Sequence, residues 1–159
     1  MQILELLIVL IACNGAPIVL ARLLASRFAD PLDGGRLAWD GRPWLGKSKT
    51  WRGVLASVCA GGVLGLVIDW GAGAGVIFAG CVMLGDLVSS FTKRRLNMVS
   101  SAKATFLDQV PESLLPLIYA VSALGYDATT AGLALVGFFV FETQISPLLF
   151  RLGIRARPH

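Results

Sequence analysis

Charged residues are scarce in this chain of 159 residues. Asp, Glu, Lys and Arg together make up 15% of the sequence, whereas hydrophobic residues make up 55%. A soluble globular domain usually carries about 25% charged residues. The composition therefore excludes an ordinary soluble domain and predicts an integral membrane protein.

Histidine and cysteine are also scarce, which limits the chemistry open to the chain. The sequence contains one histidine, His159, and three cysteines. Cys13, Cys59 and Cys81 lie in apolar runs and form no CxxC pair, which favours a packing role over a zinc site or a disulfide framework. We therefore expect neither histidine-based catalysis nor a cysteine metal centre.

Five apolar runs are candidates for membrane-spanning helices: residues 3–24, 53–70, 75–91, 110–124 and 131–150. The first run contains Glu5 and lacks a basic leading segment, so we expect a retained span rather than a cleavable signal peptide. The fourth run is shorter than the roughly 17–25 residues that cross a bilayer, and its helix is expected to begin in the preceding loop. Together the runs predict an all-α integral membrane protein with five transmembrane helices in a single domain, residues 1–159.

Basic residues lie on one side of the predicted spans. All 14 Lys and Arg residues fall in or beside segments 22–52, 93–103 and 151–157, and the connections near 70–75 and 125–130 contain none. Because basic loops stay in the cytosol, we expect the N-terminus outside and the C-terminus in the cytosol, in the inner or plasma membrane. The net charge of +4 then belongs to a cytosolic rim facing lipid head groups, and no nucleic-acid partner is expected.

The connection between the first two runs, residues 25–52, is unusually long. It contains Asp33-Gly34-Gly35, Asp40-Gly41-Arg42 and three of the four tryptophans. These turn signals predict an ordered cytosolic loop that folds back on itself, and long ordered loops usually carry function. The tryptophans are equally typical of anchors at the membrane surface.

Residues 41–48 match the phosphate-binding pattern GxxxxGK[ST]. That pattern has meaning only between a strand and a helix of a βαβ unit. Here it lies between two predicted membrane spans, and Pro43 stiffens its interior. We therefore do not expect a P-loop fold.

Asp86 is an ionisable residue inside the third apolar run. Inserting such a residue at the centre of a membrane-spanning helix costs roughly 2.5–3.5 kcal/mol, so its presence predicts a functional site with a charged partner. Helical spacing places Asp86, Ser90, Lys93 and Asn97 near one face. A second carboxylate, Asp108, precedes the fourth run.

Cationic and hydroxyl side chains gather on the same side of the membrane as these two carboxylates. They are Lys47, Lys49, Arg52, Ser89, Ser90, Lys93 and Arg94. Carboxylate oxygens suit Mg²⁺, while lysine and arginine neutralise phosphates, so the combination predicts a site for a divalent cation and a polyphosphate. The alternative, that residues 93–95 only anchor the topology, leaves both aspartates unexplained.

Four segments together resemble one family of membrane enzymes. They are NGAP at residues 14–17, LGKSKTWRG at 45–53 (after Asp40-Gly41-Arg42), GDLVSSFTKRR at 85–95 and LDQ at 107–109. In these segments the chain resembles the CDP-archaeol synthases, integral membrane CTP transferases related to phosphatidate cytidylyltransferases. It departs at Gly15, where the family commonly has alanine, and at Ser100-Ser101, where a glycine-containing turn is usual.

The resemblance implies that the protein joins CTP to an isoprenoid ether-lipid phosphate, giving a CDP-lipid and pyrophosphate. It implies Asp86 and Asp108 as catalytic Mg²⁺ ligands and Lys49 as a further catalytic residue. The cationic and hydroxyl side chains named above would bind the phosphates of CTP or of the lipid. Asn14 would contact the cytosine, the head group or another helix. No general base is needed, because a phosphate monoester is already ionised near neutral pH.

Several alternatives stay open at the level of sequence. A CTP-dependent polyprenol or phytol kinase would transfer the γ-phosphate instead, and a phosphatidate cytidylyltransferase would use an ester lipid. A small transporter or a non-catalytic scaffold would need no reaction, and a homo-oligomer is also left open. The lipid tail is expected along lipid-facing phenylalanines, namely Phe78, Phe106, Phe138, Phe139 and Phe141.

Overall fold

The computed structural model describes residues 1–99 and 104–151, and the side chains of these residues other than 105 and 145–151. The described residues form five helices: α1 (Gln2–Leu24), α2 (Trp51–Val67), α3 (Ala72–Arg95), α4 (Thr105–Ala123) and α5 (Ala128–Arg151). Each predicted run overlaps one helix. The fourth helix begins at Thr105, inside the preceding loop, as its short apolar run predicts.

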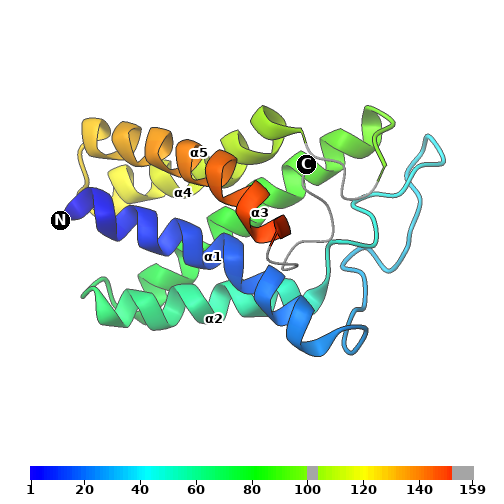
Figure 1. Ribbon diagram of the computed structural model, residues 1–159, viewed down its shortest axis with the longest axis horizontal. Coiled ribbons are helices and arrows are strands. Elements are labelled where there is room, and N and C mark those ends of the chain that lie inside the picture. Colours follow the sequence, from blue (N-terminus) through cyan, green and yellow to red (C-terminus); the bar gives the residue numbers. More distant parts are fainter. Residues whose placement is uncertain (100–103, 152–159) are drawn as a thin grey trace.

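The helices form a lengthwise bundle with two distinct ends (Figure 1). One end carries the N-terminus, the α2–α3 turn and the α4–α5 connection, and the other carries the long segment between α1 and α2. α3 packs against both α2 and α4, and α1 packs against α2 and α5. The long polar segment is therefore held at the same end as the end of α3 and the start of α4.

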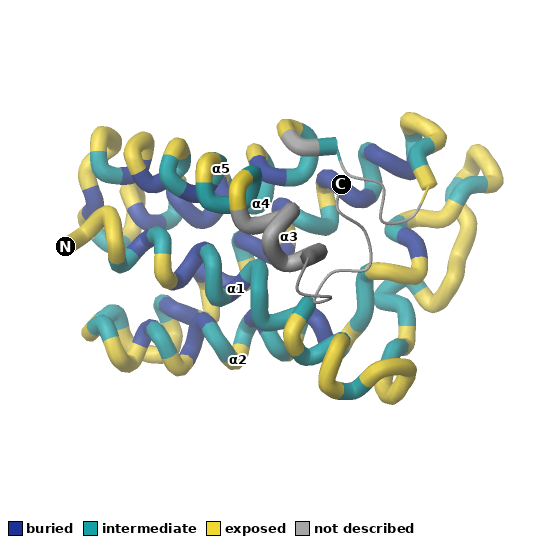
Figure 2. Tube along the Cα trace, viewed as in Figure 1, coloured by how far each residue is buried: buried dark blue, intermediate teal, exposed yellow. Residues whose placement is uncertain are grey.

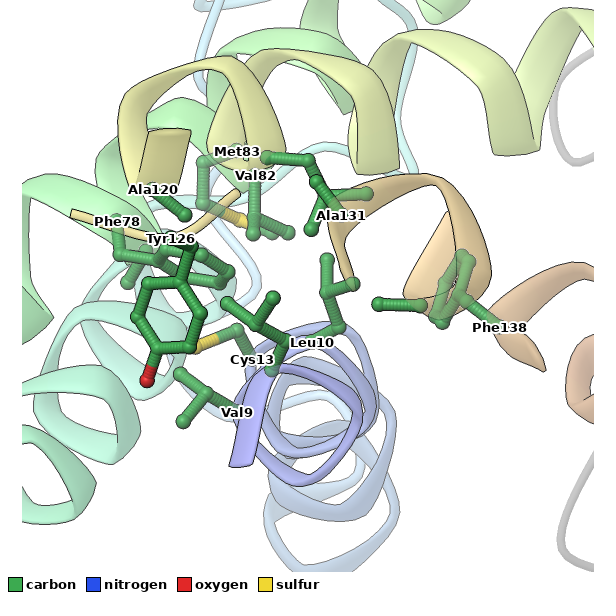
Figure 3. Close-up of a cluster of buried hydrophobic side chains, with 14 residues drawn as sticks. Val9, Leu10, Cys13, Phe78, Val82, Met83, Ala120, Tyr126, Ala131 and Phe138 are labelled. Atoms are coloured by element: carbon green, nitrogen blue, oxygen red, sulfur yellow. The ribbon is translucent and has the colours of Figure 1, made fainter. Parts of the chain in front are cut away.

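The core is built from apolar side chains of α1, α3, α4 and α5 (Figure 3). Leu10 and Cys13 of α1 are fully buried there together with Phe78 and Phe138. The prediction that Phe78 and Phe138 face the lipid is therefore wrong. Helical rotation turns both rings inward, and Phe78 packs against Trp70 with ring centroids 5.2 Å apart.

The helices also carry exposed residues on their outward faces (Figure 2). Large hydrophobic side chains such as Leu4, Leu55 and Val136 are exposed. Among the described residues, α1 and α3 are long and apolar enough to cross a membrane, and α2 is a shorter apolar helix. Extended exposed apolar surface is unfavourable in water but suits contact with lipid.

Glycines let α3 approach both of its neighbours closely. A Cβ atom at Gly75 would collide with the backbone of Gly61 in α2, and one at Gly85 would collide with the carbonyl oxygen of Pro111 in α4. Small residues at helix crossings are typical of membrane bundles. Because Gly85 has no side chain, the α3 backbone immediately before Asp86 lies directly against α4.

The end of α3 differs from the sequence prediction at one position. The helix stops at Arg95, and Asn97 lies beyond it with a φ of 59°. Asn97 is exposed and does not continue the face formed by Asp86, Ser90 and Lys93, so this part of the prediction is wrong. The Ser100-Ser101 departure lies outside the described residues.

Candidate functional site

Lys49 and Asp86 form an ion pair between the long loop and α3. The Lys49 Nζ atom lies 2.6 Å from both carboxylate oxygens of Asp86, and both side chains are about four-fifths buried. Lys49 comes just before α2, whose N-cap Thr50 accepts a hydrogen bond from the Gly53 N–H. Asp86 thus has the charged partner that an ionisable residue in an apolar helix predicts.

A second ion pair joins the end of α3 to the start of α4. The Lys93 Nζ atom lies 2.6 Å from Asp108 Oδ1, and Lys93 is buried. The other carboxylate oxygen of Asp108 accepts a hydrogen bond of 3.0 Å from the Ala104 N–H. Charges with little access to water are stable only when paired, and each of the two aspartates lies in an ion pair with a lysine.

Glu112 links the neighbourhoods of the two pairs. It lies one helical turn after Asp108 on α4, next to the α3–α4 contact at Gly85, and interacts electrostatically with Asp86, Lys49 and Asp108. The sequence interpretation gave it no role. The available signal was its i+4 spacing from Asp108, which places the two carboxylates on one face of a helix.

Ser89, Ser90 and Arg94 are buried close to these carboxylates along α3. The Ser89 hydroxyl donates to the Asp86 carbonyl oxygen (2.9 Å), and Arg94 donates to the Val99 carbonyl oxygen (2.8 Å). Both residues therefore already bond to the backbone of the site. Their phosphate-binding roles stay predictions.

Lys47, Arg52 and Asn14 are placed differently. Lys47 is exposed on the loop. Arg52 donates to the carbonyl oxygens of Ala25 (2.8 Å) and Arg27, so it fixes the chain that leaves α1. Asn14 donates to Leu10 one turn earlier in α1 (2.9 Å). The structure brings none of the three into either ion pair, and their predicted contacts with CTP or lipid stay predictions.

Asp33 organises the loop segment that leads to Lys49. Its carboxylate accepts hydrogen bonds from the N–H groups of Leu45 (2.9 Å), Gly46 (3.0 Å) and Gly35 (3.0 Å). Burial raises the pKa of this carboxyl, but the N–H donors outweigh burial and lower the pKa below its usual value. Asp33 is therefore ionised at neutral pH, and it holds the loop in one conformation.

The P-loop match at residues 41–48 has no P-loop structure. This segment is irregular, and the described part of the chain contains only isolated β-bridges, such as Pro31 with Thr50. The βαβ context that the motif requires is therefore missing there. The loop tip instead docks on α3, where Arg95 pairs with Asp40 (2.6 Å) and lies over the ring of Trp39.

Gln109 is a second residue whose role the sequence did not reveal. It follows Asp108 and is only 2% exposed, and within the described residues neither its Nε2 nor its Oε1 atom has a hydrogen-bond partner. Leaving such an amide unpaired costs roughly 1–3 kcal/mol. A buried polar group with unused hydrogen-bonding capacity, next to Asp108 in the chain, is suited to contact a polar ligand.

The arrangement can bind a phosphorylated ligand with a divalent cation. Asp86 and Asp108 offer hard oxygen donors, and two lysines supply compensating positive charge. Within the described residues no three His, Cys, Asp or Glu side chains converge as a ready-made cage. Mg²⁺ is usually held by one or two carboxylates together with substrate phosphates, so the donor set fits a cation that binds with its nucleotide.

Comparison with curated proteins identifies relatives along most of the chain, although no protein-family model matches it. The CDP-archaeol synthase of Hyperthermus butylicus is 36% identical over 122 residues, which cover 73% of this chain and 69% of the relative. That of Thermococcus kodakarensis is 31% identical over 147 residues, covering 80% and 81%. That of Sulfolobus acidocaldarius is 28% identical over 158 residues, covering 94% and 91%.

A solved structure agrees with these relatives. It is described as an intramembrane enzyme for archaeal membrane lipid biosynthesis. It is 29% identical to this chain, with a TM-score of 0.74 over 89% of this chain and 90% of its own. Sequence and fold point to one family, as the four motif segments predict. The chain belongs to the CDP-archaeol synthase family.

Proposed function

We propose that this protein transfers the cytidylyl group of CTP to the phosphate of an isoprenoid ether glycerolipid, releasing pyrophosphate. Two Lys–Asp ion pairs at the loop end of the helix bundle carry the proposal. The relatives of this bundle are CDP-archaeol synthases and an intramembrane enzyme of archaeal lipid biosynthesis. Such a site presents charge to phosphates at the edge of the bilayer. Family membership favours this activity over the kinase, transporter and scaffold alternatives.

The reaction needs positioning and charge neutralisation more than acid–base chemistry. An oxygen of the lipid phosphate attacks the α-phosphorus of CTP, and the bond from that phosphorus to the β-phosphate oxygen breaks. Pyrophosphate leaves with the bonding electrons, and the attacking oxygen is already ionised. Holding the two phosphates in line is worth several kcal/mol, and fixed positive charge stabilises the transition state.

The residues of the two ion pairs divide this work. Asp86 and Asp108 would hold Mg²⁺, with Glu112 as a neighbouring carboxylate. When bound, the cation neutralises charge on the phosphate oxygens. Lys49 and Lys93 pair with the two aspartates, and they would also bind phosphate oxygens of the nucleotide. The same lysines would thus pair with the carboxylates and supply positive charge to the substrate.

A labelling experiment separates this function from its nearest alternative. Purified protein is incubated with Mg²⁺, di-geranylgeranyl-glycerol phosphate and CTP labelled at either the α- or the γ-phosphate. Cytidylyl transfer places the α-label in the lipid and the γ-label in pyrophosphate. A γ-label in the lipid would identify a kinase. Ester-linked phosphatidic acid is expected to react more slowly, and faster reaction with it would reject the ether-lipid assignment.

We further propose that the loop end of the bundle faces the cytosol. The basic residues of segments 22–52 and 93–95 support this orientation, because they lie at that end. In a cysteine-free background, a membrane-impermeant thiol reagent should label Gln2→Cys and Thr129→Cys in intact cells. Lys47→Cys should be labelled only after permeabilisation. All three positions are exposed, and labelling of Lys47→Cys in intact cells would reverse the orientation.

A further inference from the structure

Three aromatic rings fasten the tip of the loop between α1 and α2 to the end of α3. Trp39 and Trp44 of the loop pack against Phe91 of α3 with ring centroids 6.1 and 5.5 Å apart, and against each other at 5.8 Å. Arg95, one turn further along α3, lies over the rings of Trp39 and Phe91 and pairs with Asp40 at 2.6 Å. The aromatic cluster of Trp39, Trp44 and Phe91 is therefore held in one arrangement.

The aromatic cluster leaves much of its apolar surface uncovered. Trp39 is 75% exposed and Trp44 is 42% exposed. Exposing large apolar rings to water is unfavourable. Tryptophan combines such a ring with one N–H donor, which suits a boundary between apolar and polar surroundings. The exposed rings therefore fit a partner that is apolar at one level and polar at the next.

The aromatic cluster stands at the end of an outward-facing stripe of α3. The stripe repeats at four- and three-residue intervals, which places its members on one face of the helix, and it consists of Leu84, Val88, Phe91 and Arg95. Leu84 and Val88 are exposed. Because α3 is long and apolar enough to cross a membrane, these exposed apolar side chains suit contact with lipid. The cluster continues that lipid-facing surface toward the loop.

Helix geometry gives the depth of the cluster. A hydrocarbon layer of about 30 Å corresponds to about 20 helical residues at a rise of about 1.5 Å per residue. Asp69 is exposed in the turn before α3, which begins at Ala72, and about 20 residues from that start end at Phe91. Arg95 lies about 6 Å further along the axis, at the level of the head groups. Tryptophan is enriched at this boundary.

We propose that Trp39 and Trp44 insert at the boundary between hydrocarbon and head groups and anchor the loop to the lipid surface. The sequence left the tryptophans open between a functional loop and a membrane anchor. The charge of the segment matches a surface of head-group phosphates, because Arg36 is exposed and its carbonyl oxygen accepts a hydrogen bond from the Trp44 N–H (3.2 Å). The anchor holds the segment that leads to Lys49, and it does not depend on which reaction the protein catalyses.

Fluorescence quenching by labelled lipids tests the anchor. The protein with Trp39 as its only tryptophan (Trp44→Phe, Trp51→Phe and Trp70→Phe) is reconstituted into phosphatidylcholine vesicles. The vesicles carry a nitroxide quencher either close to the glycerol or close to the end of the acyl chain. Leu84→Trp in a tryptophan-free background is the depth reference, because Leu84 is exposed on the same stripe and lies about 10 Å before Phe91 along α3.

We expect the shallow quencher to reduce Trp39 fluorescence at least about twofold more than the deep quencher does, because the ring lies at the boundary. The order should reverse for Leu84→Trp. Quenching of Trp39 by aqueous iodide but by neither labelled lipid would place the loop tip in water and overturn the proposal.

A single substitution guards against rearrangement of the aromatic cluster in the triple variant. Trp39→Phe in the otherwise unchanged protein keeps a ring beside Phe91 and leaves the Arg95–Asp40 pair in place. It should remove part of the emission that the shallow quencher suppresses. An unchanged quenching profile would also overturn the proposal. Neither measurement uses CTP or turnover, so its outcome is separate from that of the proposed reaction.

Discussion

Replacing Asp86 by asparagine is expected to reduce CDP-lipid formation at least about 1,000-fold, which corresponds to roughly 4 kcal/mol of transition-state stabilisation. The substitution removes a charged oxygen ligand and leaves the partly buried Lys49 without its counter-ion. Both effects are large, because breaking a buried ion pair alone costs about 3–5 kcal/mol. Asp108→Asn should have a similar effect through Lys93. Initial rates at saturating CTP and Mg²⁺ measure the loss.

Asp69→Asn is the matched control for these variants. Asp69 is exposed in the turn between α2 and α3, at the opposite end of the bundle, and has a φ of 61° that asparagine tolerates. Its activity should stay at the wild-type level. Monodisperse elution and an unchanged melting temperature for Asp86→Asn would show that the loss is chemical. An Asp86→Asn protein with near-normal turnover would remove Asp86 from the proposed metal site.

The sequence was sufficient to predict the helices and the presence of a charged partner beside Asp86. Apolar runs of membrane length have few alternative structures, and a carboxylate inside one is costly enough to require a function. The partner of Asp86 could not be deduced in the same way. Lys49 is 37 residues distant in sequence, and its position depends on how Asp33 folds the intervening loop.

The rotation of each helix about its axis and the exact helix ends were harder to predict from the sequence. Phe78 and Phe138 are in the core because of the way α3 and α5 rotate against α1, and a nearly uniform apolar sequence carries little information on rotation. Asn97 was assigned to a helical face that ends two residues earlier, at Arg95. Glu112 shares a face with Asp108, but Pro111 next to it made helical spacing there an unsafe assumption.

Removing the charge of Lys49 should cost far more activity than removing that of Lys47. Lys49→Met leaves Asp86 partly buried and unpaired, so we expect kcat/KM to fall at least about 100-fold, or roughly 2.7 kcal/mol. Lys47 is exposed two residues earlier and joins neither ion pair, so Lys47→Met should lower kcat/KM less, because it would lose only its predicted contact with phosphate. Gly41→Ala is a weaker comparison, because Gly41 has a φ of 72° that strains any other residue.

A double variant tests whether Lys49 and Asp86 act as one unit. If the lysine works through the aspartate, Lys49→Met combined with Asp86→Asn should be no less active than Asp86→Asn alone, because residues that act together show non-additive losses. If Lys49 instead contacts only the phosphates, the two losses should add, giving a further reduction of about 100-fold. Full activity in Lys49→Met would contradict both mechanisms and leave the ion pair with a purely structural role.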